Sequence, residues 1–182
     1  MNSYGAKDLA RQFRVVRGNT IKIAEEIDEK NYDFQPTKET RTVRQLLTHI
    51  ATLPRFNTRL HGTEKATTLA GYDFGSVMGP LMAEEQKPRT KAEIIELLKT
   101  EGEKYATQLE SCTEEFLGEI VQYPEGMTPP TKSRFEMLIA AKEHEMHHRA
   151  QLMVAQRLLG QTPHLTRQMM ERVAAMAAAH KA

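Results

Sequence analysis

The stretch AKEHEMHHRAQL, residues 141–152, places three histidines within five positions of a segment that otherwise has the pattern of a buried helix. On a helical projection of residues 137–155, one seam recurs at alternating steps of four and three residues, the spacing of positions that face the interior of a helical bundle. The seam consists of Met137, Ala141, His144, His148, Gln151 and Ala155. The sequence therefore predicts a helix whose inward face carries histidines.

Helical periodicity also dominates the rest of the chain, and the alternation typical of strands is scarce. A first helix is expected over residues 5–29, where apolar residues recur at three- and four-residue steps. Three further helices begin at capping boxes, in which a Ser or Thr is followed three residues later by Glu or Gln. The boxes open at Thr42, Thr90 and Ser133. We expect Pro54 to kink or break the second helix and Gly160 to end the fourth.

Residues 62–89 carry glycines and prolines without periodicity, which predicts a long connection containing one short helical turn at most. Thr162 followed by Pro163 predicts a final helix, rich in Met and Ala, up to about His180. We expect its methionines to pack into the core, with a homodimer interface as the alternative. The fold class is thus all-α: a four-helix bundle with an additional C-terminal helix, in a single domain over residues 1–182.

Composition restricts the classes of function. The 182 residues hold 25 Lys and Arg against 24 Asp and Glu, which gives no basic field for nucleic acid. The single cysteine, Cys112, cannot form an internal disulfide, and one thiolate is too few for a typical structural zinc site. No run approaches the ~20 apolar residues of a membrane span, and the N-terminus lacks the apolar core of a signal peptide. We expect a soluble, cytoplasmic protein with no membrane partner, and N and O ligands for any metal.

His144 and His148 lie one helical turn apart, a separation at which two imidazoles can bind one metal ion. A third ligand is expected from a facing helix, because a catalytic-type site uses three protein ligands. His49, in LLTHIATL among apolar neighbours, is the candidate. The alternative is a metal-free pair of buried imidazoles, whose unsatisfied ring nitrogens would cost ~1–3 kcal/mol each.

The remaining histidines are weaker candidates. His147 flanks the seam, and we expect it in the wall of a pocket rather than on a metal. His61, His164 and His180 lie in or near segment ends and are expected at the surface, although His164 could approach the mouth of a site.

The same letters also form the H-E-x-x-H motif of zinc metallopeptidases, in which His144 and His148 bind zinc and Glu145 is the general base. The metzincin continuation is absent, so a third ligand would have to be a downstream carboxylate such as Glu171. An all-helical chain also lacks the strand with which such peptidases hold substrate, so this remains a minor alternative. Glu145 is nevertheless our candidate catalytic residue, because it could orient an imidazole or shuttle a proton.

Three blocks of sequence, in this order and spacing, resemble the DinB-like (YfiT-like) family of metal-dependent enzymes. They are RTVRQLLTHIA (41–51), LIAAKEHEMHHRAQL (138–152) and RLLGQTP (157–163). One departure is Ala150, where the family usually has the glycine of HRGQ. The resemblance spans most of the chain, and the two histidine blocks together are fairly specific.

The resemblance implies a four-helix bundle of the up-down-down-up type in which His49, His144 and His148 bind one divalent ion, Zn or Ni. Members of the family resemble thiol-dependent S-transferases that use bacillithiol or mycothiol, or are called metal-dependent hydrolases. We therefore expect an enzyme acting on a small molecule, by hydrolysis or by thiol transfer with a low-molecular-weight thiol as partner. The alternative is a non-catalytic binding or structural protein whose metal stabilises the fold.

Overall fold

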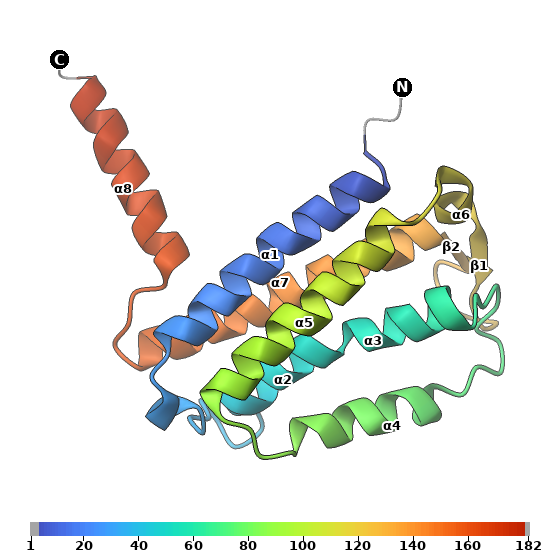
Figure 1. Ribbon diagram of the computed structural model, residues 1–182, viewed down its shortest axis with the longest axis horizontal. Helices are drawn as coiled ribbons and strands as arrows, with labels where there is room; N and C mark the ends of the chain where they lie inside the picture. Colours follow the sequence, from blue (N-terminus) through green and yellow to red (C-terminus); the bar gives the residue numbers. More distant parts are fainter. Residues whose placement is uncertain (1–3, 181–182) are drawn as a thin grey trace.

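The computed structural model describes residues 4–180 and contains a bundle of four long helical segments (Figure 1). These are α1 (Ala6–Glu26), a segment formed by α2 (Val43–Thr52), α3 (Pro54–Asn57) and the π-helix η2 (Thr58–Thr63), α5 (Lys91–Glu110) and α7 (Arg134–Leu158). Figure 1 shows α1 and α7 running in one direction and the other two segments in the opposite one, as the up-down-down-up type requires. The predicted four-helix bundle is confirmed.

The three predicted capping boxes form, and they start the helices where expected. The hydroxyls of Thr42, Thr90 and Ser133 each accept a hydrogen bond from the backbone N–H three residues on, and the Gln or Glu at that position returns a contact. Gly160, with φ of 78°, follows the end of α7 in the left-handed conformation typical of a helix stop. The first helix ends at Glu26, three residues before the predicted boundary.

Pro54 breaks the second helix, as expected. Helix α2 ends at Thr52, and α3 begins at Pro54, whose missing N–H costs nothing at the first position of a helix. The chain then continues in η2 to Thr63, so the segment is slightly longer than the sequence indicated.

The prediction of a long connection over residues 62–89 is wrong, because this segment contains the twelve-residue helix α4 (Phe74–Glu85). Asp73 caps its first turn by accepting from the N–H of Ser76 at 3.1 Å. Pro80 cannot donate to the carbonyl of Ser76 inside this helix, and Arg59 Nη1 contacts that oxygen instead at 3.4 Å. Helix α4 contacts α2 and buries side chains at four-residue steps, namely Val77, Leu81 and Glu85.

Four short elements lie between the long helical segments. They are η1 (Glu29–Asn31), α6 (Glu114–Gly118) and the antiparallel strands β1 (Ile120–Gln122) and β2 (Thr131–Ser133). The sequence did not predict this hairpin, because three-residue strands are too short to show alternation. It leads directly into α7 at the end of the bundle remote from α8 (Figure 1).

The last helix, α8 (His164–Ala179), corrects the expectation of a methionine-rich core segment. It projects away from the bundle (Figure 1), and His164 is its only buried residue among those described. Its large apolar side chains are exposed: Met169, Met170, Val173 and Met176. The helix begins one residue later than predicted, with Pro163 instead of Thr162 at the capping position. None of the helices described here combines the length and apolarity needed to cross a membrane.

A buried ion pair joins helices α1 and α7, and its arginine also contacts two further helices inside the bundle. Arg17 of α1 donates to both oxygens of Glu145 of α7, at 2.9–3.1 Å, and the two side chains are only 4% and 3% exposed. Thr20 Oγ1 donates to the same carboxylate at 2.7 Å. The stem of Arg17 lies over Gly102 of α5, where an added Cβ would come within 2.8 Å of Arg17 Cγ. Arg17 also donates to the carbonyls of Leu98 of α5 and Ile50 of α2, so four helices, α1, α2, α5 and α7, are packed around one desolvated arginine.

Candidate metal centre

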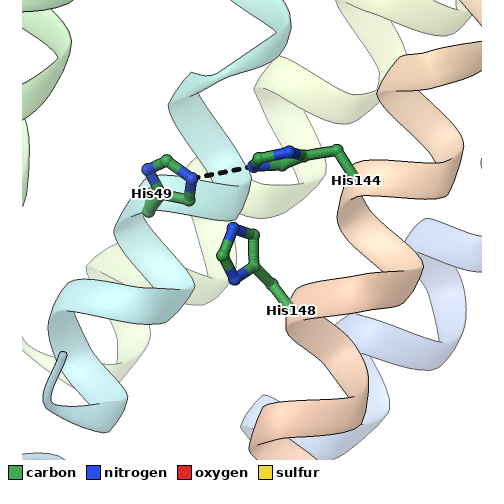
Figure 2. A group of neighbouring side chains, drawn as sticks. All are labelled: His49, His144 and His148. Carbon is green, nitrogen blue, oxygen red and sulfur yellow. Dashed lines mark hydrogen bonds between the residues drawn. The ribbon is translucent and has the colours of Figure 1, made fainter. Parts of the chain in front are cut away.

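His49, His144 and His148 come together between α2 and α7 (Figure 2). Each offers one ring nitrogen, and these atoms all lie within 4.8 Å of one another. The Nε2 atoms of His49 and His144 are 3.0 Å apart. The structure therefore assembles all three predicted ligands from segments 95 residues apart in the sequence.

The burial of α7 differs from the predicted seam at two of its residues, because His144 is only partly buried and Gln151 is exposed. Glu145 and His148 face the core, whereas His144 lies beside them and keeps part of its surface in contact with solvent. His148 is 7% exposed and His49 is 8% exposed. The three imidazoles thus lie at the boundary between the core and solvent, where a metal could retain an open coordination position.

Two of the imidazoles are oriented by hydrogen bonds from their outer nitrogens. His49 Nδ1 contacts Glu85 Oε1 of α4 at 2.8 Å, and His148 Nδ1 contacts Gln151 Oε1 at 2.8 Å. Because a carboxylate and an amide oxygen can only accept, these contacts assign the proton of each ring to Nδ1. The Nε2 lone pairs of His49 and His148 are then free for the shared centre. This is the usual arrangement around metal-binding histidines.

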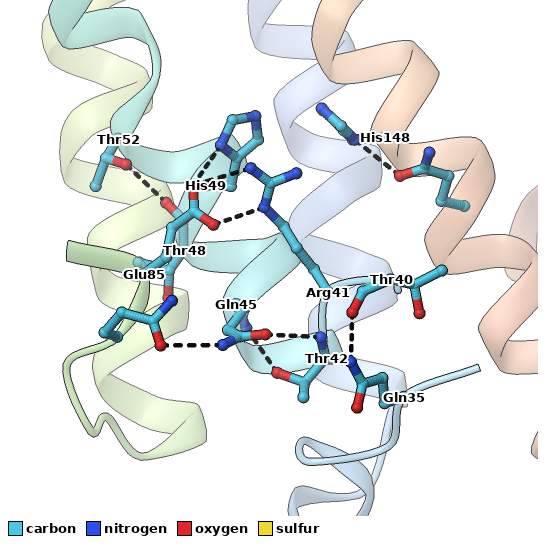
Figure 3. A network of polar contacts seen from close by, with 12 residues as sticks. Gln35, Thr40, Arg41, Thr42, Gln45, Thr48, His49, Thr52, Glu85 and His148 are labelled. Carbon is cyan, nitrogen blue, oxygen red and sulfur yellow. Dashed lines mark hydrogen bonds and ion pairs between the residues drawn. The ribbon is translucent and has the colours of Figure 1, made fainter. Parts of the chain in front are cut away.

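Glu85 is itself fixed by an arginine. Arg41 Nε donates to Glu85 Oε2 at 2.6 Å, and Arg41 Nη2 donates to Glu85 Oε1 at 3.3 Å (Figure 3). The chain Arg41–Glu85–His49 runs from the partly exposed guanidinium to the buried imidazole. The carboxylate holds His49 in one tautomer and one orientation.

The environment keeps all three imidazoles neutral at pH 7. Burial, together with the neighbouring His148 and His49, lowers the pKa of His144 to about 4. Burial also lowers the pKa values of His49 and His148, although the hydrogen bonds that these rings donate to Glu85 and Gln151 oppose this effect. Neutral imidazole is the form that binds a metal ion.

The arrangement fits a divalent transition metal. Two nitrogens that are each ~2.0–2.1 Å from a tetrahedral ion lie ~3.4 Å apart, so the 3.0 Å separation of His49 and His144 needs only a small adjustment. Without an ion, one of these two nitrogens must carry a proton and donate to the other. Three neutral nitrogen donors suit Zn or Ni and are a poor set for Mg or Ca, which prefer oxygen.

Glu145, the candidate catalytic residue, is adjacent to His144 in sequence but points into the ion pair with Arg17 and Thr20. Both of its oxygens accept hydrogen bonds there. Glu171, the carboxylate that a metallopeptidase site would require, is exposed on α8 and does not belong to the cluster.

The other histidines have separate places. His147 is exposed, with its ring 5.0 Å from that of His148, and it is not one of the residues that line the cavity beside His148, so the expected pocket-wall position is not found. His180 is exposed as expected. His61 and His164 correct the surface expectation, because both are buried: His61 contacts Arg134 Nη1 at 3.0 Å, and His164 contacts Asn19 at 3.2 Å. Segment ends pack against neighbouring helices here, and the sequence pattern gave no signal of this.

Sequence analysis missed Glu85 and Arg41. Glu85 lies on α4, which the glycines and prolines concealed, and its four-residue spacing from Leu81 and Val77 was the available signal. Arg41 directly precedes the capping residue Thr42, at a position where charge is ordinary. Nothing in the sequence alone linked either residue to His49.

A cavity of about 560 Å³ lies beside the centre. His148 and Gln151 of α7, Glu85 of α4, and Arg41 contribute to its lining. The site is therefore accessible to a small molecule from the side of His148.

Comparison with known proteins gives the same fold. The model of the DinB family matches residues 1–175. YjoA of Bacillus subtilis (strain 168), an uncharacterized protein, is 24% identical over 157 residues, which are 86% of this chain and 92% of YjoA. The crystal structure of YjoA, a DinB-like protein, aligns with a TM-score of 0.62 over 85% of this chain and 93% of its own.

YfiT, also from Bacillus subtilis, aligns with a TM-score of 0.65 at 18% identity, over 89% of this chain and 91% of its own. YfiT is described as a probable metal-dependent hydrolase with an unusual four-helix bundle topology. At these identities the two structures demonstrate a common fold.

Proposed function

Because this chain belongs to the DinB family, we propose that it is a metal-dependent enzyme that acts on a small molecule by hydrolysis or by thiol transfer. His49, His144 and His148 would hold one divalent ion, Zn or Ni. The observation that carries the proposal is the convergence of three neutral imidazoles beside an accessible cavity. The description of YfiT as a probable metal-dependent hydrolase supports it.

A divalent ion in such a site lowers the pKa of a water or thiol that binds to it, and thereby supplies a nucleophile at neutral pH. The protein's own residues have positioning roles. Glu85 and Gln151 fix the rings of His49 and His148 through their Nδ1 atoms. Glu145, held by Arg17, anchors α7 between the two histidines that this helix contributes.

Two alternatives fit the site less well. A purely structural metal is usually enclosed by four protein ligands, whereas this cluster offers three and borders a cavity. A metallopeptidase needs Glu145 as a general base, but both oxygens of this buried carboxylate are engaged by Arg17 and Thr20. We therefore place hydrolysis of small molecules and thiol transfer ahead of both.

The first test is the metal content of tag-free protein, measured by ICP-MS. We expect about one equivalent of Zn or Ni in the wild type and a loss of this metal in His49→Ala. His147→Ala is the matched control, because His147 lies next to His148 but outside the cluster. A wild-type protein that takes up neither Zn nor Ni after incubation with the salts would refute the proposal.

The second test separates catalysis from a structural role. Metal-loaded wild type and His49→Ala are assayed against a panel of esters, amides and lactones, and for consumption of a small thiol in the presence of an electrophile. Turnover that requires His49 and the metal supports the enzyme. Stoichiometric metal without turnover in either assay favours the non-catalytic alternative.

A further inference from the structure

The cavity beside the metal centre has a mixed lining. Its apolar residues come from α2 and α7 and include Val43, Leu46, Leu152 and Ala155. Its polar residues include Arg41 and His148. A volume of about 560 Å³ lies within the range of pockets for small organic molecules. The lining thus suits a molecule that has both an apolar and a polar part.

Arg41 has a donor to spare. Its hydrogen bonds run from Nε and Nη2 to Glu85, so Nη1 has no acceptor among the residues that the structure describes. The side chain is 38% exposed, and Figure 3 shows the guanidinium between Glu85 and His148. Glu85 fixes the guanidinium plane, so the free edge is held in place before a ligand arrives.

The charge at this end of the cavity favours an anion. The three imidazoles are neutral, so they would leave both charges of a divalent ion uncompensated. Glu85 balances only Arg41. The nearest other carboxylate of the lining, Glu39, is exposed and lies 3.9 Å from Lys38.

We propose that the cavity binds a small organic anion, with its carboxylate or phosphate head on Arg41 and its apolar body against Val43, Leu46 and Leu152. The inference names the substrate class of the function proposed above and rests on it for the neighbouring ion. The contact with Arg41 itself is measurable with or without metal. A guanidinium edge can bind an oxyanion through charge-assisted hydrogen bonds, which a neutral amide cannot reproduce.

The test compares three probes of similar size by titration calorimetry: 3-phenylpropionate, 2-phenylethylphosphonate and the neutral 3-phenylpropanamide. Each is titrated into zinc-loaded and chelator-treated protein. We expect the two anions to bind about 10- to 100-fold more tightly than the amide. Arg41→Gln should abolish most of this preference in both forms, and Arg41→Lys should retain part of it.

Arg55→Gln is the matched control. Arg55 is 36% exposed in its side chain and pairs with Glu101, but it lies outside this cavity. Its replacement should leave the preference unchanged. The metal content and helicity of each variant are also measured, so that a loss of fold is recognised. If Arg41→Gln fails to fold, Arg41→Lys is compared with the wild type in its place.

Equal binding of anions and amide, no binding of any probe, or an unchanged preference in Arg41→Gln would overturn the inference. A preference that disappears with the metal but persists in Arg41→Gln means that the ion alone selects the anion, which overturns the inference and leaves the proposed function intact. An Arg41-dependent preference in a protein that takes up no metal supports the inference and overturns the proposed function.

Discussion

Arg17→Met should be among the most destabilising single substitutions in this protein. It leaves Glu145 as a buried charge, 3% exposed, whose only remaining side-chain partner among residues 4–180 is Thr20. Breaking a buried ion pair from one side costs ~3–5 kcal/mol. The carbonyls of Leu98 and Ile50, which accept from Arg17 at 2.8 and 3.0 Å, lose a donor as well. We therefore expect the upper half of this range.

Arg14→Met is the matched control, since Arg14 lies one turn earlier on α1 and pairs with Glu103 and Glu110 at the surface. Exposed pairs of this kind contribute ~0–1 kcal/mol. The assay is urea denaturation of chelator-treated protein, followed by circular dichroism, so that metal loss does not enter the free energy of unfolding. In a melting experiment the Arg17 variant should unfold ~8–20 °C below the wild type.

Arg17→Met combined with Glu145→Leu tests the cause. Removing the stranded carboxylate should recover much of the lost stability, because an apolar pair can replace a buried ion pair at little cost. The reasoning is refuted if Arg17→Met costs no more than Arg14→Met, or if the double variant is less stable than Arg17→Met alone.

Three further predictions concern separate parts of the molecule. Glu85→Ala should weaken metal binding ~10- to 100-fold in a competition titration, whereas Glu84→Ala, which loses pairs only with Lys87 and Arg89, should not. Burial lowers the pKa of His61 from 6.5 to about 4. Between pH 4 and pH 6.5 the unfolded chain therefore binds one proton more than the folded protein. The stability present above pH 6.5 is lost as the pH falls towards 4. His61→Gln should flatten the dependence of the urea midpoint on pH in this range. An unchanged slope would contradict the assignment of this pH dependence to His61. Deleting residues 169–182 should change the free energy of unfolding by less than ~0.5 kcal/mol, because the described part of this segment is exposed; a larger loss of stability would reveal contacts with the bundle.

The strongest local signals in the sequence predicted the bundle and two of the three clustered histidines. Capping boxes at Thr42, Thr90 and Ser133 depend on residues three positions apart, so a short window contains the whole interaction. The pair His144 and His148 is equally local. His49 required the additional inference that α2 faces α7, which the apolar stripe and the family resemblance both supported.

What the sequence did not reveal depends on contacts between distant segments. Glu85 reaches His49 only because α4 packs on α2, and Pro80 concealed that helix. Glu145 has the same local pattern whether it serves the metal or Arg17, and its partner lies 128 residues away. The exposure of the α8 methionines was likewise unpredictable, because an amphipathic helix looks the same whether or not its apolar face is covered.

The close approach of Arg17 to Gly102 constrains how this protein can evolve. Any side chain at position 102 would collide with the arginine stem, while a shorter residue at position 17 would strand Glu145. The three positions, on α1, α5 and α7, are therefore epistatic: a substitution at any one of them alone lowers the stability of the protein. Relatives that lack the arginine should also have replaced the acid, and only they are free to carry a larger residue in place of the glycine.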